Sequence, residues 1–357
     1  MFSSTHIPGR GAARAVIAGF GLLLLAAACS DDDGTEAAGE SGGEARPFDG
    51  ETIELVVGYD PGGSFDDAAR WLQPYLEEQT GATVVVENRP GAGNLIALNY
   101  VWASEPDGSV IGTLNGPGNT VTVLAETASD SVEFELPRFS YLAGLTSEPR
   151  LMTVGADSPY ETFEDLLAAD EEILLGVTGT SGSGYNDAVF MQSVFGDQIE
   201  TEIVSGFESG AENQLALIRG EVDASFNLLG GELAAIEAGE IRGLVVLGNE
   251  RSPLLPDVPA IVEYDLPADV MEMLDIHITI SQLGVALVAP PDLPDDLLGP
   301  LSDAVFEAAS DPALVEEATS RGVNWAPRTG AELKSAVEDA LDAPAEYVEL
   351  MREAATS

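Results

Sequence analysis

From Glu51 onward, short apolar segments alternate with amphipathic ones. Ile53–Gly58, Thr83–Glu87 and Val110–Leu114 have the length and β-branched content of buried strands. Phe65–Gln79, between the first two, carries apolar residues at helical spacing. Further strands are predicted near residues 173–177, 203, 225, 244 and 282–289, and further helices near 94–104, 185–195, 295–309, 312–320 and 330–352. This alternation predicts an α/β fold of doubly wound parallel sheets covered on both faces.

The first 28 residues have the pattern of a secretory signal. Arg10 and Arg14 precede an apolar run, Ala15–Ala28, which is too short to span a bilayer and ends at Cys29. A cysteine directly after three alanines resembles a bacterial lipoprotein cleavage site, so residues 1–28 are predicted to be removed and Cys29 to be lipidated. The alternative is an ordinary signal with an incidental cysteine. Removal of residues 1–28 would delete two arginines and no acids, which would change the formal charge from −48 to −50.

Residues 29–48 are polar and acidic and lack hydrophobic periodicity, so they are predicted to form a flexible tether. The segment includes Gly39-Glu40-Ser41-Gly42-Gly43, which matches the nucleophile-elbow pattern G-x-S-x-G. Because that motif requires a preceding strand and none is predicted here, it does not indicate a hydrolase.

The composition excludes several classes of function. With 62 acids against 14 bases, the chain lacks the basic surface that nucleic-acid binding requires. This acidity is similar to that of proteins kept soluble in high salt. One cysteine allows no internal disulfide and no cysteine-based zinc site, and no metal or organic cofactor is expected.

Two glycine-rich loops connect predicted strands to predicted helices. The first is Tyr59–Ser64 and the second is Thr178–Gly184. Glycine lets the backbone approach a ligand closely, and the free N–H groups of a helix start attract anions. Neither loop matches a phosphate-binding P-loop or a full dinucleotide fingerprint. Two such loops favour a ligand site formed between two domains, whereas each alone is equally compatible with a tight turn.

The motifs of the chain resemble the tripartite tricarboxylate transporter receptors, the Bug family of extracytoplasmic solute-binding proteins. The resemblance rests on GYDPGGSFDDAARWLQPYLEEQTGATVVVENRPGAG (58–93), EPDGSVIGTLN (105–115), IRGEVDASFN (218–227), IEAGEIRGLVVLGNERSPLLPDVPAIVE (236–263) and LGVALVAPPDLP (283–294). It implies a two-lobed periplasmic-binding-protein-like fold of type II, in which a hinge with two crossovers lets the lobes close on a small carboxylate. The receptor would be a monomer outside the cytoplasmic membrane and would deliver its ligand to membrane transporter subunits.

The resemblance also implies which residues contact the ligand. The carried-over positions are Pro61, Gly62, Gly63, Ser64 and Asp66 in the first loop, Asn115 and Gly116 after the third strand, Thr178, Gly179, Thr180, Ser181, Gly182 and Ser183 in the second loop, and Asn227. Asn227 stands where relatives usually carry aspartate, and Val204–Glu208 replaces a stretch with tyrosine and lysine. These departures put the usual ligand in doubt.

The expected lobes are residues 49–145 with 250–357, and residues 146–249. The chain should cross between them near Leu145 and near Gly248–Arg251, and these crossovers would act as hinges.

Several residues have simpler structural interpretations. Asp66 and Asp67 are also favourable acids in the first turn of a helix. Arg89 is expected to form a salt bridge with Glu87 or a neighbour, and Trp71 and Trp102 are expected in the core. His277 lies in an alternating, strand-like segment and is expected to be packed rather than catalytic.

Three other functional classes remain possible from the sequence. A secreted serine hydrolase could use Ser181 or Ser183 with His277, the one histidine left after removal of the signal. A receptor of another transporter type is a closer alternative, and a surface lipoprotein without a ligand is the third.

Overall fold

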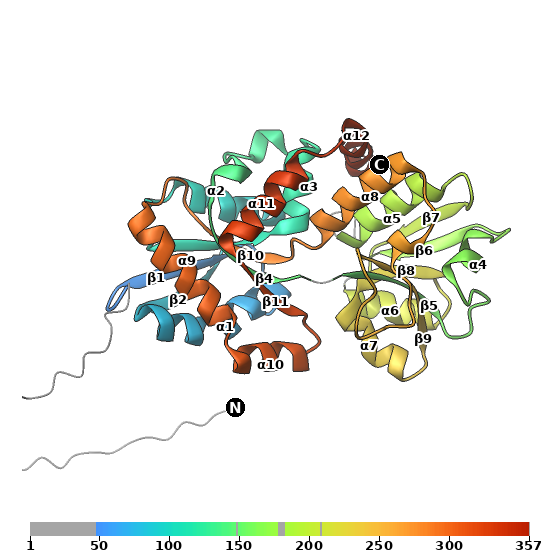
Figure 1. Cartoon of the computed structure of the whole chain (residues 1–357), viewed down its shortest axis with the longest axis horizontal. Helices are drawn as coiled ribbons and strands as arrows, with labels where there is room; N and C mark the ends of the chain where they lie inside the picture. Colours follow the sequence, from blue (N-terminus) through green and yellow to red (C-terminus); the bar gives the residue numbers. More distant parts are fainter. Residues whose placement is uncertain (1–47, 148, 178–182, 208, 357) are drawn as a thin grey trace, which may run out of the picture. The chain divides into compact units, whose positions relative to one another are not determined.

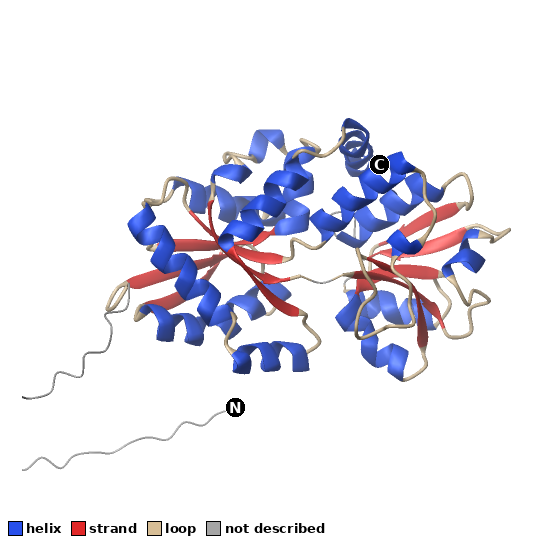
Figure 2. Cartoon of the chain, viewed as in Figure 1, coloured by secondary structure: helices blue, strands red, loops and turns tan. Residues whose placement is uncertain are grey.

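The computed structural model describes residues 48–147, 149–177, 183–207 and 209–356. It contains two β-sheets, each with helices against both faces (Figures 1 and 2). The first sheet has the strands β1 (Thr52–Val57), β2 (Thr83–Asn88), β3 (Val110–Asn115), β4 (Ser140–Thr146), β10 (Val285–Ala289) and β11 (Trp325–Thr329). The second sheet has β5 (Arg150–Gly155), β6 (Ile173–Val177), β7 (Thr201–Ser205), β8 (Ala224–Leu228) and β9 (Ile241–Leu247).

The helices follow the strands along the chain. They are α1 (Ser64–Thr80), α2 (Leu95–Ala103), α3 (Gly116–Leu124), α4 (Phe163–Leu167), α5 (Ser183–Phe195), α6 (Gly210–Ile218), α7 (Leu229–Glu237), α8 (Ala268–Ser281), α9 (Asp295–Ala309), α10 (Pro312–Ser320), α11 (Gly330–Leu341) and α12 (Ala345–Thr356). Short 3₁₀ turns lie at Ala92–Asn94, Ser129–Ser131, Leu136–Arg138 and Ile261–Glu263.

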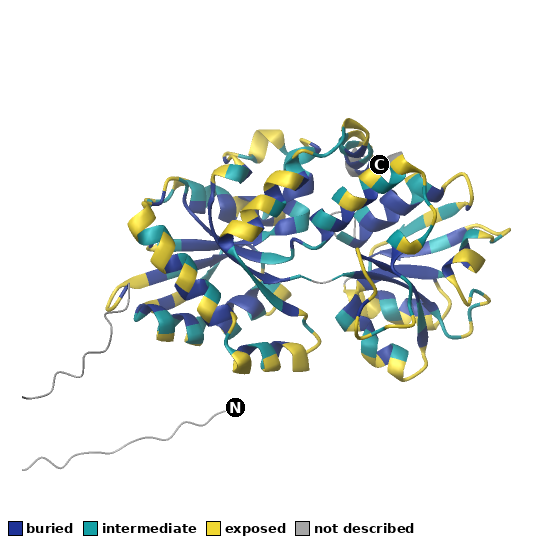
Figure 3. Cartoon of the chain, in the orientation of Figure 1, coloured by how far each residue is buried: buried dark blue, intermediate teal, exposed yellow. Residues whose placement is uncertain are grey.

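Both faces of the first sheet are buried, which explains its apolar strands. Ile53, Leu55 and Val57 of β1 point into one hydrophobic cluster, whereas Val56 points into another on the opposite face. Helix α1 covers the first face with Leu72 and Leu76, both fully buried. Figure 3 shows this buried interior in dark blue along the strands, with exposed residues on the outer faces of the helices.

The sheets are mixed, so the prediction of parallel sheets was wrong in part. The strand order is β11-β4-β10-β3-β1-β2 in the first sheet and β7-β6-β8-β5-β9 in the second. β1 is parallel to β2 and β3, but β10 is antiparallel to β3 and β4, and β11 is antiparallel to β4. Likewise β6 is parallel to β7 and β8, whereas β5 is antiparallel to β8 and β9. The antiparallel strands include those by which the chain enters a sheet from the other one, and a short apolar run does not encode that direction.

The chain passes between the sheets twice. It leaves β4 at Thr146 and enters β5 at Arg150, and it returns from the end of α8 at Ser281 to the start of β10 at Val285. The two crossovers touch, because the Val285 amide donates to the Thr146 hydroxyl at 2.9 Å. A methyl group on Gly284 would lie 2.0 Å from the Thr146 carbonyl oxygen, so this contact requires glycine.

The return crossover lies at residues 282–284 instead of near Gly248–Arg251. The segment after β9 stays with the second sheet, where the Val246 amide donates to the Pro259 carbonyl at 2.9 Å. The hydrophobic cluster that contains α5 and the second sheet also includes apolar side chains of α8 and α12, together with Val121 of α3, the adjoining Ala125, and Ala340 of α11. Both α8 and α12 are expected in the first lobe from the sequence; in the structure α12 packs on α5, whereas α8 contacts α3 and α11 as well as α5.

Candidate ligand-binding site

Asp66 shapes the first glycine-rich loop. It lies in the first turn of α1 with 2% of its surface exposed, and its Oδ2 accepts from the Gly62 amide and from Arg70 Nε, both at 2.8 Å. Its Oδ1 accepts from Asn88 Nδ2 at 2.9 Å. Burial raises the pKa of Asp66, but the hydrogen bonds from Arg70, Gly62 and Asn88 outweigh burial and lower it to about 2. The carboxylate therefore stays ionised and fixes a loop in which Gly62 has a φ of 84°.

Hydrogen bonds join the ends of β1, β2 and β3. Asn88 Nδ2, at the end of β2, also donates to the Tyr59 carbonyl at 3.0 Å. Asn115 Nδ2, at the end of β3, donates to the Tyr59 hydroxyl at 2.7 Å, while Asn115 Oδ1 accepts from the Gly118 amide at 3.1 Å and caps α3. These bonds bring Asn115 to Tyr59, which lies two residues before Pro61.

Gly116 connects this edge to the return crossover. Its amide donates to the Gly284 carbonyl at 2.9 Å, and a methyl group at Gly116 would lie 2.4 Å from Leu283 Cβ. Gly116 is buried. The contacts of Gly116 are therefore with the return crossover, at Leu283 and Gly284.

Pro61, Gly62, Gly63 and Ser64 are exposed at the start of α1. The Ser64 hydroxyl makes no hydrogen bond to any part of the chain that the structure describes. Gly63 precedes α1 in an extended conformation, and α1 runs for 17 residues. An exposed hydroxyl beside the start of a long helix can donate to an anion.

The predicted residues of the second sheet are only partly described. Thr178 to Gly182 lie outside the described residues, and Ser183, half-buried, begins α5. Asn227, at the end of β8, is 8% exposed and donates from Nδ2 to the Ser225 hydroxyl at 3.2 Å.

Asn227 belongs to a buried polar cluster with Ser225, Thr153 and Glu232. The Thr153 hydroxyl is 3.2 Å from the Ser225 hydroxyl and donates to Glu232 Oε2 at 3.3 Å. Burial raises the pKa of Glu232, and the hydrogen bonds from its neighbours, Asn227 among them, offset this only partly. An aspartate at position 227 would add a second carboxylate beside Glu232, whereas the amide of Asn227 adds no charge.

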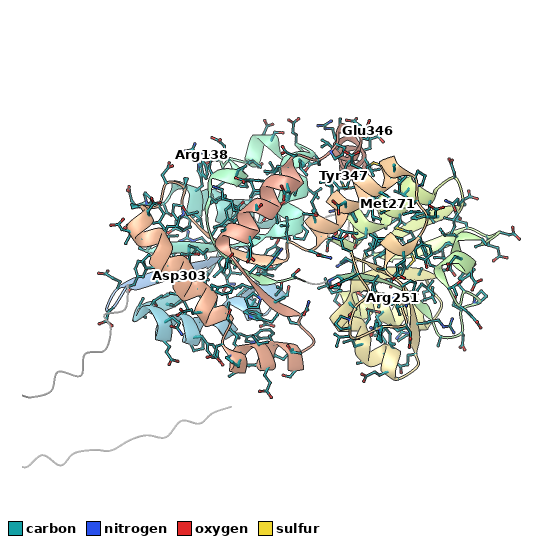
Figure 4. All side chains as sticks on the ribbon, viewed as in Figure 1. Arg138, Arg251, Met271, Asp303, Glu346 and Tyr347 are labelled. Atoms are coloured by element: carbon teal, nitrogen blue, oxygen red, sulfur yellow. The ribbon has the colours of Figure 1, made fainter. Side chains whose placement is uncertain are left out.

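The most buried charged group among the described residues, Asp187 with its partners, was not predicted from the sequence. Asp187 Oδ2 accepts from Arg150 Nε at 2.6 Å, and Asp187 Oδ1 accepts from His277 Nε2 at 3.0 Å. His277 Nδ1 is 3.0 Å from the hydroxyl of Tyr347, which is labelled on α12 in Figure 4. The exposed fraction is 5% for Arg150 and at most 1% for Asp187, His277 and Tyr347. Burial would raise the pKa of Asp187, but the Arg150 charge and the hydrogen bond from His277 lower it.

This network determines the role of His277. Both of its ring nitrogens are engaged, Nε2 with Asp187 and Nδ1 with the Tyr347 hydroxyl. The ring stacks on Phe190 at a centroid distance of 4.2 Å. His277 is packed, as expected, but it lies in the helix α8 and not in a strand. Engaged in this way, it has no nitrogen to spare as the base for Ser183.

The ion pair predicted for Arg89 is confirmed. Arg89 forms an ion pair with Glu87 at 2.7 Å and also contacts Glu54 at 3.2 Å. Trp71 and Trp102 are partly buried against hydrophobic clusters of the first sheet. Among the described residues, no group of three or more His, Cys, Asp or Glu side chains could hold a metal ion. The helices of that part of the chain also lack the length and hydrophobicity needed to cross a bilayer.

The comparison with known families is decisive. The model of the "Tripartite tricarboxylate transporter family receptor" matches residues 68–342. The chain belongs to this receptor family. The receptor is 28% identical over 307 residues to a UPF0065 protein of Bordetella pertussis, and the match covers 85% of the receptor and 90% of that relative. The family resemblance drawn from the motifs is thereby confirmed.

Solved structures agree on the fold. A TctC solute-binding protein from Polaromonas superposes with a TM-score of 0.70 at 21% identity, covering 85% of the receptor and 98% of that chain. MatC from Rhodopseudomonas palustris, solved with bound malate, gives a TM-score of 0.61 at 21% identity, covering 84% and 99%. The predicted two-lobed fold of periplasmic binding proteins is therefore confirmed.

Proposed function

We propose that the receptor captures a small organic carboxylate between loops of its two sheets and presents it to membrane transporter subunits. The observation that carries this proposal is the hydrogen bond from Asn115 to the Tyr59 hydroxyl, which joins the end of β3 to the start of the loop Tyr59–Ser64 at one edge of the first sheet. The second glycine-rich loop follows β6, which has the same direction as β8, and Asn227 is the last residue but one of β8. In each sheet, these loops thus follow the carboxyl ends of strands. The crossovers connect the same two edges, and α/β folds bind ligands at the carboxyl ends of their strands. MatC, of the same fold, binds malate.

Neutral donors are proposed to hold the carboxylate. The Pro61–Ser64 loop contains no lysine or arginine, and neither does Thr178–Ser183. The net charge of −48 opposes the approach of an anion, and dissolved salt screens that repulsion. The backbone N–H groups at the start of α1 and the Ser64 hydroxyl supply donors without a full charge. We therefore expect moderate salt to leave the affinity unchanged or to raise it.

The first experiment is native mass spectrometry of the purified receptor, which would identify a bound molecule by mass. Calorimetric titration then follows with malate and a series of linear dicarboxylates. Ser64→Ala removes one neutral donor and should weaken binding about two- to tenfold, which corresponds to about 0.5–1.5 kcal/mol.

Gly63→Val should nearly abolish binding, because the new side chain blocks close approach to the loop. The substitution is compatible with the fold, since a Cβ at Gly63 would have Asp60 O, at 3.5 Å, as its nearest neighbour. The matched control is Gly299→Val, on α9, where a Cβ meets no atom within 4 Å. Normal affinity in Gly63→Val, or affinity that collapses with salt, would place the anion elsewhere.

We further propose that the receptor is a monomer held outside the cytoplasmic membrane by lipid on Cys29. Its tether would be residues 29–47 and not 29–48, because Phe48 is buried in the core of the first sheet and its amide donates to the Thr80 carbonyl at 3.0 Å. Its lobes would be the two sheets with their helices, and the hinges would be the crossovers at 147–149 and 282–284. A ligand that bridges both lobes stabilises the closed form and shifts the population toward it. Small-angle scattering should then show compaction at saturating ligand, and an unchanged profile would argue against closure.

A further inference from the structure

A cavity of about 410 Å³ lies beside the crossovers. Pro149 and Gln282, one from each crossover, line it together with Leu229 and Leu233 of α7. Leu254, from the segment after β9, and Val323, from the segment before β11, complete the apolar wall. This volume is within the range of roughly 300–1,000 Å³ found for small-molecule pockets.

The strand order separates this cavity from the proposed carboxylate site. In the first sheet β4 and β10 carry the crossovers, with β11 on one side and β3, β1 and β2 on the other. In the second sheet β5 carries a crossover, with β9 on one side and β8, β6 and β7 on the other. The proposed carboxylate loops follow β1, β3 and β6, whereas the cavity is lined by the segments adjoining β9 and β11, by the crossovers and by α7, which begins directly after β8. We call this side of the crossovers the far side.

The charge of the lining differs from that of the chain as a whole. The described lining contains one acid, Glu250, and one base, Arg251. Arg251 is already engaged, because its Nε and Nη2 donate to the two Glu263 carboxylate oxygens, both at 2.7 Å, and its Nη1 donates to the Pro256 carbonyl. Figure 4 labels Arg251 in the part of the chain that contains the second sheet. An anion would therefore find no free cation among the described lining residues.

The rest of the lining is suited to an uncharged molecule. Leu254 is 60% exposed, an apolar surface without a protein partner on an otherwise acidic chain. Polar groups are limited to hydroxyls and amides such as those of Asn249 and Gln282. Apolar walls with a few hydrogen-bonding groups are the usual composition of an organic ligand site.

We propose that the far-side cavity is a second binding site, which takes an uncharged, largely apolar organic molecule with one hydrogen-bonding group. Its walls come from helices and connecting segments attached to both sheets and from both crossovers, so an occupant contacts each part that moves when the lobes close. Binding there is consequently coupled to carboxylate affinity, and this coupling alone rests on the proposed function.

The test uses 2-naphthol, an uncharged bicyclic probe, on the full chain after removal of its signal. Methyl NMR spectra of leucine and valine would be followed during titration at neutral pH. We expect saturable shifts at Leu229, Leu233 and Val323. Leu233→Trp fills the cavity and should weaken probe binding at least tenfold, and Val323→Trp does the same from the opposite wall.

The matched control is Leu215→Trp. Leu215 lies on the neighbouring helix α6, is 48% exposed and does not line the cavity. This variant should bind 2-naphthol as the unmodified receptor does. Non-saturable shifts, or equal binding in folded Leu233→Trp and Val323→Trp variants, would overturn the second site.

The coupling has its own readout. The probe should change the dissociation constant of the carboxylate by the same factor as the carboxylate changes that of the probe. An unchanged carboxylate constant would refute the coupling. If no carboxylate binds at all, the proposed function fails, while saturable naphthol binding would still establish the cavity site.

Discussion

Replacing Asp187 by alanine tests how the receptor tolerates buried charge. The substitution removes the acceptor of Arg150 Nε and of His277 Nε2. The Arg150 guanidinium then keeps one described partner, the Phe226 carbonyl at 3.2 Å. Removing one member of a buried ion pair leaves the other without compensation and costs about 3–5 kcal/mol.

The free energy of unfolding would be measured by urea denaturation followed by far-ultraviolet circular dichroism. With an m-value of about 3 kcal/mol/M, the expected loss lowers the urea midpoint by about 1–1.7 M. Tryptophan fluorescence adds a regional readout, because Trp71, Trp102 and Trp325 all pack in clusters of the first sheet. A mutant whose dichroism falls before its fluorescence would unfold first in the second sheet, where Asp187 lies.

Two controls separate burial from charge removal. Glu317→Ala breaks the exposed Arg321–Glu317 pair, whose side chains are 54% and 41% exposed, and should cost about 0–1 kcal/mol. The double variant Arg150→Met with Asp187→Leu removes both buried charges and should be more stable than Asp187→Ala. A loss in Asp187→Ala no larger than in Glu317→Ala would refute the reasoning.

Three further predictions concern stability and anchoring. Gly58→Ala would place its methyl group 1.7 Å from the buried Asn94 Oδ1, so thermal unfolding should show a loss of about 1–3 kcal/mol, with Gly299→Ala near neutral. The pKa of Asp66 is lowered to about 2, so its contribution to stability is complete above about pH 4 and is lost as pH falls toward 2. Acid titration of Asp66→Asn should therefore lack that loss. Cys29→Ser should abolish lipid labelling and release the receptor from membranes, and retained label would exclude this anchor.

The sequence predicted the alternation of strands and helices, because buried strands and amphipathic helices have distinct periods. It failed at α8. Ile276, Ile278 and Ile280 alternate as in a strand, yet they lie in a helix of 14 residues. Leu274, His277, Ile278 and Ile280 are buried, whereas Ala268, Glu272 and Asp275 are exposed along one face of this helix. The β-branched isoleucines near its end are typical of strands, and packing in the folded chain overrides that preference.

The candidate site was predictable to a similar extent. The glycine-rich loops stand out because strand, loop and helix follow one another directly in the sequence. The sequence does not indicate the buried network around Asp187. Its partners are distant along the chain, since Arg150 lies 37 residues before Asp187 and His277 lies 90 residues after it. Ion pairs at such separations depend on how the helices pack, and one sequence contains no signal for them.

The packing of α12 on α5 affects when the hydrophobic core of the second sheet can be completed during synthesis. Tyr347 and Met351 belong to the same hydrophobic cluster as Phe190 and Phe195, which precede them by more than 150 residues. Synthesis therefore delivers the second sheet and α5 well before the helix that covers them. Until α12 arrives, Phe190 and His277 lack the Tyr347 ring that packs beside them. A nascent chain thus exposes part of this core until α12 has been synthesised, and a chain that folds only after that point forms the whole cluster in one step.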